Sequence, residues 1–122
     1  MTRLSLRFLR ATAFVLAATA GVAAPAAAES WGAVAMGPAS AYGWAVNYPN
    51  RQAAIDAALQ SCEGKCTKYL AFEEGCGAIA MGNDGGGWGT GASRQAAERN
   101  ALDACTGETA GCRVRVWGCN AD

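Results

Sequence analysis

The six cysteines are the residues whose type and number most directly indicate chemistry in this chain of 122 residues. An even number of cysteines in a short exported chain, which the N-terminus described below indicates, is typical of a disulfide framework. Zinc binding is the alternative, but zinc sites usually combine short cysteine spacings with histidine, and the sequence has no histidine. We therefore predict disulfides, with no metal and no cofactor, at Cys62, Cys66, Cys76, Cys105, Cys112 and Cys119.

Catalytic constellations are largely excluded by composition. Without histidine the chain holds neither a Ser-His-Asp nor a Cys-His site. Glu73-Glu74 is the one carboxylate doublet, and paired carboxylates could act in a small cell-wall hydrolase. The glycine-rich segment 82–87 lacks the Lys-Ser/Thr of a phosphate loop and the alternating acids of a calcium loop, so we predict a hairpin turn there. We predict no catalytic residues, with the carboxylate hydrolase as the alternative.

Two tryptophans and two arginines form the candidate binding surface. Trp44 and Trp88 are each flanked by glycine, and exposed tryptophan can stack on sugars or anchor a protein partner. Arg51 and Arg94 each begin an expected helix, where a cation opposes the helix dipole by a few tenths of a kcal/mol. An ion pair, stacking on tryptophan or ligand capture would explain why both repeats have the arginine. Structural roles, in the core for the tryptophans, are the simpler expectation.

The N-terminus has the three parts of a secretory signal peptide. Arg3, Arg7 and Arg10 precede an apolar stretch from Ala11 to about Ala24, and small residues follow up to Ala28. The apolar stretch is shorter than the roughly 20 residues of a membrane-spanning helix. We predict cleavage near Ala28 and a secreted or periplasmic domain over residues 29–122, with an uncleaved anchor as the alternative.

The charge of the predicted mature domain excludes several partners. Three of the ten basic residues lie in the predicted signal peptide, so seven basic and ten acidic residues remain, a net charge of about −3. A weakly acidic domain has no electrostatic reason to bind nucleic acid or an anionic membrane. We expect neither as a partner of the mature form, and another secreted or envelope protein is the expected kind of partner.

The sequence repeats itself. Trp31–Gly37 recurs as Cys76–Gly82 with five of seven residues identical, and Arg51–Cys62 recurs as Arg94–Cys105 with seven of twelve identical. The two units cover about 31–76 and 76–119. Two copies are too few for a solenoid, so we predict one duplicated domain.

Each unit has the same local pattern of two strands, a helix and a third strand. In the first unit we expect strands at 33–36, 42–48 and 68–72, and a helix capped by Asn50. In the second, Ser93 caps the helix and the last strand covers 113–117. The predicted fold is α+β, a pseudo-twofold duplication of a ββαβ unit, disulfide-stapled, with both helices packed on one face of a sheet.

Symmetry leaves two simple disulfide schemes. The first pairs Cys62–Cys66 and Cys105–Cys112 within the units and links the units through Cys76–Cys119. The second links Cys62–Cys105 and pairs Cys66–Cys76 and Cys112–Cys119 locally. We prefer the first because a helix that ends in a tight turn brings its two cysteines together.

The whole predicted domain resembles a small secreted bacterial family known as domain of unknown function 4189. The resemblance rests on the order of Trp31-Gly32-Ala33-Val34-Ala35, Tyr42-Gly43-Trp44, Arg51-Gln52-Ala53-Ala54, Gly75-Cys76-Gly77-Ala78-Ile79-Ala80, Arg94-Gln95-Ala96 and Val116-Trp117-Gly118-Cys119. It implies a bacterial exported domain and no particular activity. Small size, disulfides and missing catalytic groups predict a non-enzymatic binding or inhibitor-like module, with a structural envelope protein as a further alternative.

Overall fold

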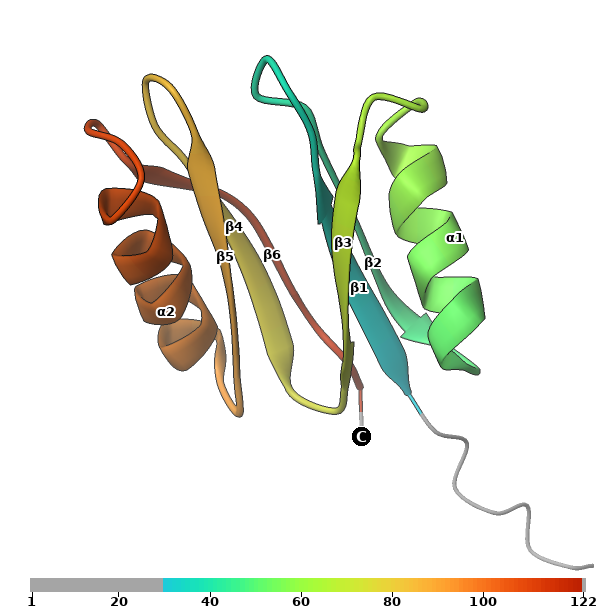
Figure 1. Cartoon of the computed structure of the whole chain (residues 1–122). Helices are drawn as coiled ribbons and strands as arrows, with labels where there is room; N and C mark the ends of the chain where they lie inside the picture. The colour runs from blue at the N-terminus through green and yellow to red at the C-terminus, as the bar shows by residue number, and fades with distance from the viewer. Residues whose placement is uncertain (1–29, 122) are drawn as a thin grey trace, which may run out of the picture.

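The computed structural model describes residues 30–121 (Figure 1). The predicted signal peptide, residues 1–28, lies outside the described residues. The order ββαβ occurs twice, as predicted. The elements are β1 (Trp31–Met36), β2 (Tyr42–Tyr48), α1 (Arg51–Ser61), β3 (Lys68–Glu73), β4 (Cys76–Met81), β5 (Gly86–Gly91), α2 (Arg94–Thr106) and β6 (Arg113–Cys119).

The strands form two antiparallel sheets, in contrast to the one sheet expected from the sequence. Their orders are β2-β1-β3 and β5-β4-β6, so the first strand of each unit is central. The sheets face each other, with α1 on the outer side of the first sheet and α2 on the outer side of the second (Figure 1). Each helix therefore covers one face of its own sheet, and the expectation that both helices share one sheet is wrong.

The two central strands explain the second sheet, because they are apolar on both faces. In β1, Ala33 and Ala35 pack in the cluster under α1, whereas Val34 and Met36 belong to the core between the sheets. The same alternation occurs in β4. A strand that is apolar on both faces needs a covering layer on each side. The helix supplies one layer, and the other sheet supplies the second.

Both helices begin at the predicted caps. The Asn50 side-chain oxygen accepts a hydrogen bond from the Ala53 N–H at 2.8 Å, and the Ser93 hydroxyl accepts one from the Ala96 N–H at 3.2 Å. Such caps satisfy backbone donors that have no partner inside the helix. Small residues then permit close approach to the sheet, since a Cβ atom on Gly89 of β5 would lie only 2.3 Å from the Ala101 nitrogen of α2.

The ring of Phe72 lies between the two sheets, next to the first residues of β1 and β4. A Cβ atom on Gly32 would lie 2.4 Å from the Phe72 ring, and one on Gly77 would lie 2.5 Å from it. These distances are too short for any side chain. The ring of Phe72 is therefore held between two glycine surfaces, and Val34, Met36, Ile79 and Met81 complete the core between the sheets.

The structure has the disulfides Cys62–Cys66, Cys105–Cys112 and Cys76–Cys119, which is the first symmetric scheme. The two local bridges join the end of each helix to the segment that precedes the next strand. Cys76 and Cys119 lie directly opposite each other on β4 and β6. This long bridge therefore lies within the second sheet, and the expectation that it links the two units across their pseudo-twofold axis is wrong.

Over residues 30–121, no helix has the length and apolar character needed to cross a membrane.

The glycine contact with Phe72 can be tested by adding one methyl group. We expect Gly77→Ala to lower the free energy of unfolding by about 1–3 kcal/mol, because the new Cβ overlaps the ring. Gly107→Ala is the matched control, since its Cβ would have no neighbour closer than 3.6 Å. Urea unfolding of the oxidised protein measures both. Equal stability of the two variants would contradict the proposed close contact.

Candidate functional site

The two predicted tryptophans lie at opposite edges of the sheet pair. Trp44 of β2 is 40% exposed, and its ring lies against Gly118 of β6, where a Cβ would be 2.7 Å away. Trp88 of β5 packs against the core between the sheets, with the Lys68 ammonium of β3 at 5.6 Å from the ring centroid. Because β2 contacts β6, whereas Trp88 of β5 contacts Lys68 of β3, the two rings do not share a surface.

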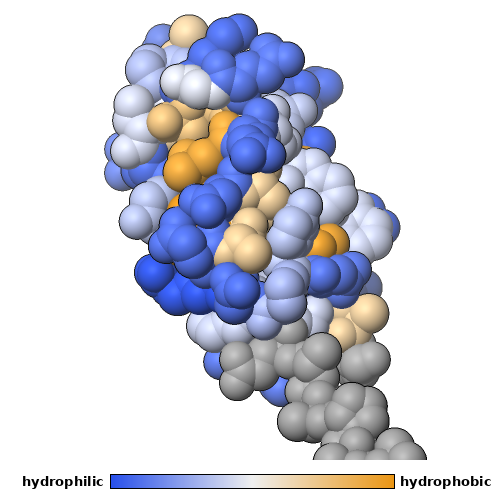
Figure 2. Space-filling model, turned by 90° about the vertical axis from the view of Figure 1, so that its right-hand side faces the viewer, coloured by the Kyte–Doolittle hydropathy of each residue, from blue (hydrophilic) through white to orange (hydrophobic). Residues whose placement is uncertain are grey.

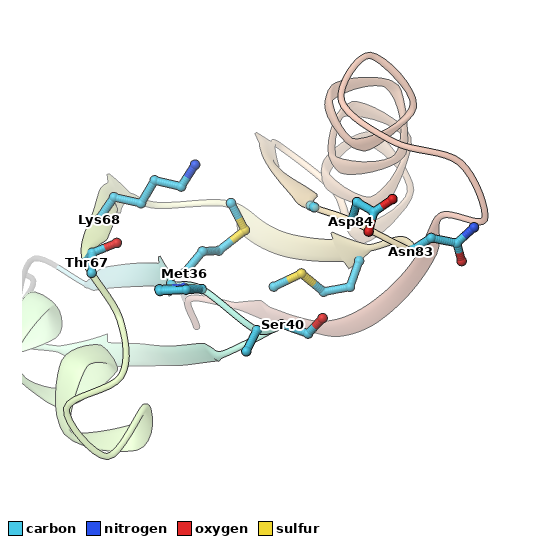
Figure 3. Close-up of a pocket in the computed structure, with 12 residues that line it drawn as sticks. Met36, Ser40, Thr67, Lys68, Asn83 and Asp84 are labelled. Carbon is cyan, nitrogen blue, oxygen red and sulfur yellow. The ribbon is translucent and has the colours of Figure 1, made fainter.

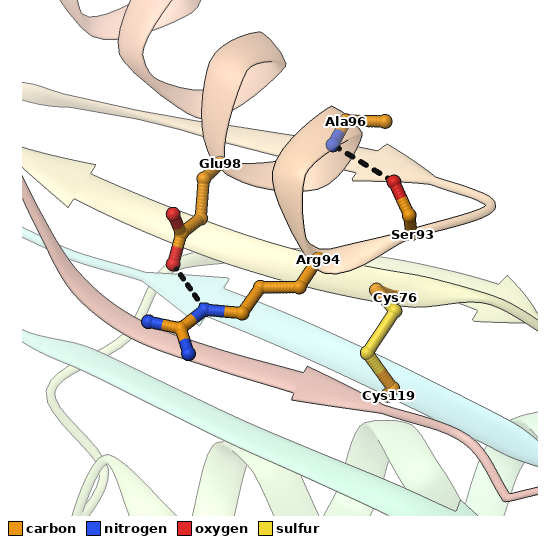
Figure 4. A network of polar contacts seen from close by, with 6 residues as sticks. All are labelled: Cys76, Ser93, Arg94, Ala96, Glu98 and Cys119. Carbon is orange, nitrogen blue, oxygen red and sulfur yellow. Dashed lines mark hydrogen bonds and ion pairs between the residues drawn. A yellow bond between two sulfur atoms is a disulfide. The ribbon is translucent and has the colours of Figure 1, made fainter.

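The two predicted arginines also have different surroundings. The Arg94 guanidinium lies over the Trp117 ring at 4.0 Å from its centroid. Figure 4 shows its other contact, in which Nε donates to Glu98 at 2.8 Å. Arg51 is exposed, and no ion pair or ring contact of its side chain occurs within residues 30–121. The four predicted residues therefore do not converge on one site. Trp117 was not among them, because it has no tryptophan counterpart in the other repeat; its contact with Arg94 comes from α2, the helix that precedes β6.

The surface that carries α1 offers no better candidate. Figure 2 shows this side of the molecule, on which hydrophilic colours predominate and the hydrophobic ones form small separate patches. The polar residues Gln52, Asp56 and Gln60 of α1 are exposed, as expected for its outer face.

The difference between the arginines gives a matched pair of variants. We expect Arg94→Ala to lower the free energy of unfolding by about 0.5 kcal/mol, because it loses the stacking and the ion pair. The effect is small because half of the Arg94 side chain is exposed and water screens the charge. Arg51→Ala should leave stability unchanged or slightly higher, since it removes only a cation at a helix start. Thermal unfolding at low salt measures both, and equal effects would contradict the assigned contacts.

A cavity of about 560 Å³ lies at one end of the interface between the sheets. It opens between the β1–β2 turn (37–41) and the β4–β5 turn (82–85), and we call it the turn-end cavity (Figure 3). Met36 and Met81, which are 4% and 3% exposed, form its floor. Its polar lining is Ser40, Thr67, Lys68, Asn83 and Asp84. The cavity thus combines an apolar floor with a polar rim.

The β1–β2 turn is held in an unusual conformation. Ala39 and Ser40 both have a positive φ, 58° and 60°, and Ala41 N–H donates to the Pro38 carbonyl at 3.3 Å. Two successive positive φ angles are typical of a type I′ hairpin turn, which normally contains glycine, asparagine or aspartate. A residue with a Cβ atom costs roughly 1–2 kcal/mol in this conformation. Backbone strain of this kind often accompanies a binding loop.

Each turn is supported from behind by a disulfide-closed loop. Gly37 lies so close to the backbone at Lys65 that a Cβ would be 2.0 Å from the carbonyl oxygen. In the second turn, the Asp84 N–H donates to the Thr109 hydroxyl at 2.9 Å, and the Asn83 N–H to the Ala110 carbonyl at 2.9 Å. Cys62–Cys66 and Cys105–Cys112 close these two supporting loops. The two turns beside the cavity are therefore supported by loops that disulfides close.

The predicted carboxylate pair lies at the other end of the sheets. Lys68 lines the turn-end cavity at the start of β3, whereas Glu73 ends the same strand. Glu73 and Glu74 are exposed beside a shallower hollow of about 470 Å³. Within residues 30–121, no group of three or more histidine, cysteine, aspartate or glutamate side chains is placed to hold a metal ion.

The fold and its cavity define a small disulfide-stapled α+β domain formed by two ββαβ units. Residues 31–119 match the family described as "Domain of unknown function (DUF4189)", and the chain belongs to this family.

Mycobacterial relatives support this assignment. The uncharacterized protein Rv1813c of Mycobacterium tuberculosis is 33% identical over 90 residues, which cover 74% of this chain and 60% of that protein. Protein Rv1269c of the same organism is 34% identical over 94 residues, covering 77% and 73%. The NMR structure of Rv1813c superposes with a TM-score of 0.62 at 32% identity, covering 79% of this chain and 78% of that one. The chain spans about three fifths of the length of the first relative.

In the strained β1–β2 turn, a substitution by glycine is expected to stabilise the protein, whereas most substitutions destabilise it. We expect Ala39→Gly to raise the free energy of unfolding by about 1 kcal/mol, because glycine adopts a positive φ without a Cβ clash. Ala41→Gly, in the same turn but without a positive φ, should lower it by about 0.5–1 kcal/mol. Urea unfolding distinguishes the two, and destabilisation by both would contradict the turn geometry.

Proposed function

We propose that this chain is exported, loses its signal peptide near Ala28, and acts as a non-enzymatic binding module in the periplasm or medium. Its ligand site is the turn-end cavity, and the two ββαβ units are related by a pseudo-twofold axis that places their first turns on either side of it. The observation that carries the proposal is the cavity itself: an apolar floor and polar rim between two turns, each supported by a disulfide-closed loop.

The size and lining of the cavity support a small ligand or a short segment of a larger one. Ligand pockets are commonly 300–1,000 Å³ with an apolar lining and a few convergent polar groups, and this cavity measures about 560 Å³. Rigid walls support the same proposal. A binding site whose loops are already ordered loses less conformational entropy when the ligand arrives.

The alternatives have less support. A hydrolase with two carboxylates requires them on either side of the scissile bond. Glu73 and Glu74 are successive residues at an exposed turn, at the opposite end of β3 from the cavity. The position of the strained Ala39-Ser40 turn beside the cavity supports a binding role over a purely structural one.

A cavity-filling variant tests the proposal. Small-molecule and peptide libraries are screened against the oxidised, ¹⁵N-labelled protein, and we expect a ligand that shifts amide resonances of residues 37–41 and 82–86. Thr67→Trp places a large ring in the cavity and should weaken that ligand at least tenfold. Gln95→Trp, at an exposed position of α2, is the control and should bind as the parent protein does. A ligand that binds elsewhere, or equally to both variants, would refute the site.

A further inference from the structure

We infer that the turn-end cavity binds a short peptide by its free ends, with the peptide carboxylate at Lys68 and its ammonium group at Asp84. This inference rests on the proposed function and adds to it the chemical class of the ligand. It is carried by one arrangement: opposite charges on opposite walls of a cavity that has an apolar floor (Figure 3).

The two charges come from separate elements and are not paired with each other. Lys68 begins β3, and Asp84 lies in the β4–β5 turn, across the cavity from it (Figure 3). Within residues 30–121 the structure has one ion pair, Arg94–Glu98, and neither of its residues lines the cavity. Lys68 and Asp84 therefore form no ion pair in the described part of the chain. Both charged groups are therefore available to a ligand. A ligand with one negative and one positive end satisfies both, whereas a singly charged ligand leaves one of them unpaired.

Each charged residue is positioned by a neighbour outside the cavity. The Lys68 ammonium lies 5.6 Å from the centroid of the Trp88 ring, a favourable cation–π distance. The backbone of Asp84 is fixed by its N–H bond to Thr109, in the loop that Cys105–Cys112 closes. A carboxylate can therefore approach Lys68 from the cavity side while the indole ring supports the ammonium group.

The floor and the rim of the cavity can bind the part of a peptide that lies between its two charged ends. Met36 and Met81 present flexible thioether side chains, which adapt to apolar groups of different shape. Ser40, Thr67 and Asn83 supply hydroxyl and amide groups that can hydrogen-bond to peptide N–H and C=O. The cavity therefore offers partners for an apolar side chain and for the backbone around it.

A peptide fits these features better than two other small ligands. The charges lie on opposite walls, so the ends of the ligand must be separated by the width of the cavity, whereas the two charges of a free amino acid share one carbon atom. A neutral sugar is disfavoured because no aromatic ring is among the residues that line the cavity, and sugars commonly stack on such rings.

Blocked peptides test the inference. The tripeptide Ala-Leu-Ala is titrated into the oxidised, ¹⁵N-labelled protein in three forms: with free ends, N-acetylated, and C-amidated. We expect the free form to shift resonances of residues 37–41 and 82–86 and to bind about tenfold more tightly than either blocked form, because each block removes one charge-assisted contact.

Two variants assign each end to its residue. In Lys68→Gln the preference for a free carboxylate should disappear while the preference for a free amine remains. In Asp84→Asn the reverse should hold. Lys65→Gln is the matched control, since Lys65 is an exposed lysine just before β3 that does not line the cavity, and it should keep both preferences.

The outcomes separate this inference from the proposed function. If all three peptide forms bind the cavity equally, or if Lys68→Gln and Asp84→Asn do not change the preferences, recognition by the ends is refuted while the cavity remains the site. If no peptide shifts the cavity resonances but the library screen finds another ligand there, the peptide inference fails and the proposed function stands. If neither experiment finds a cavity ligand, both fail.

Discussion

The contact between the two sheets is the constraint on which the rest of the structure depends. Each sheet has three strands and one helix, which is too little to bury the second face of its central strand. The core between the sheets is small, and Phe72 is the one aromatic side chain among its buried residues. Its ring reaches both central strands because Gly32 and Gly77 leave room for it. Between the first residues of the two central strands, the distance between the sheets is thus set by one ring lying on two glycines.

The two units are not equivalent at this contact, although their sequences repeat. Phe72 lies opposite Gly32 in the first sheet, and the corresponding partner of Gly77 in the second sheet is Gly118. One unit therefore supplies a large side chain where the other has none. Gly118 leaves a space that the ring of Trp44 covers from the other sheet. A duplicated unit that packs against its own copy has to break its symmetry at the centre, because two bulky rings cannot occupy one position.

The same packing creates the cavity. With the sheets held apart at one end by Phe72 and joined through the methionines near the other, the turns that end β1 and begin β5 lie on either side of an open space. The local disulfides close the loops behind these turns. They therefore help to maintain the shape of the cavity as well as the stability of the fold. The loop closed by Cys62–Cys66 is so short that the bridge removes little conformational entropy from the unfolded chain. Its main effect is therefore to support the adjacent turn.

The sequence alone determined the local structure, because that depends on neighbours along the chain. The repeat, the caps Asn50 and Ser93, the buried alanine stripes of both helices and the order ββαβ all follow from residue type and spacing. Tertiary structure decided the number of sheets and the site. Nothing local shows that Val34 and Ile79 belong to one core between two sheets, or that Lys68 and Asp84, from different units, line one cavity. Such pairs depend on how whole sheets pack against each other, and the spacing of residues along the chain does not predict that packing.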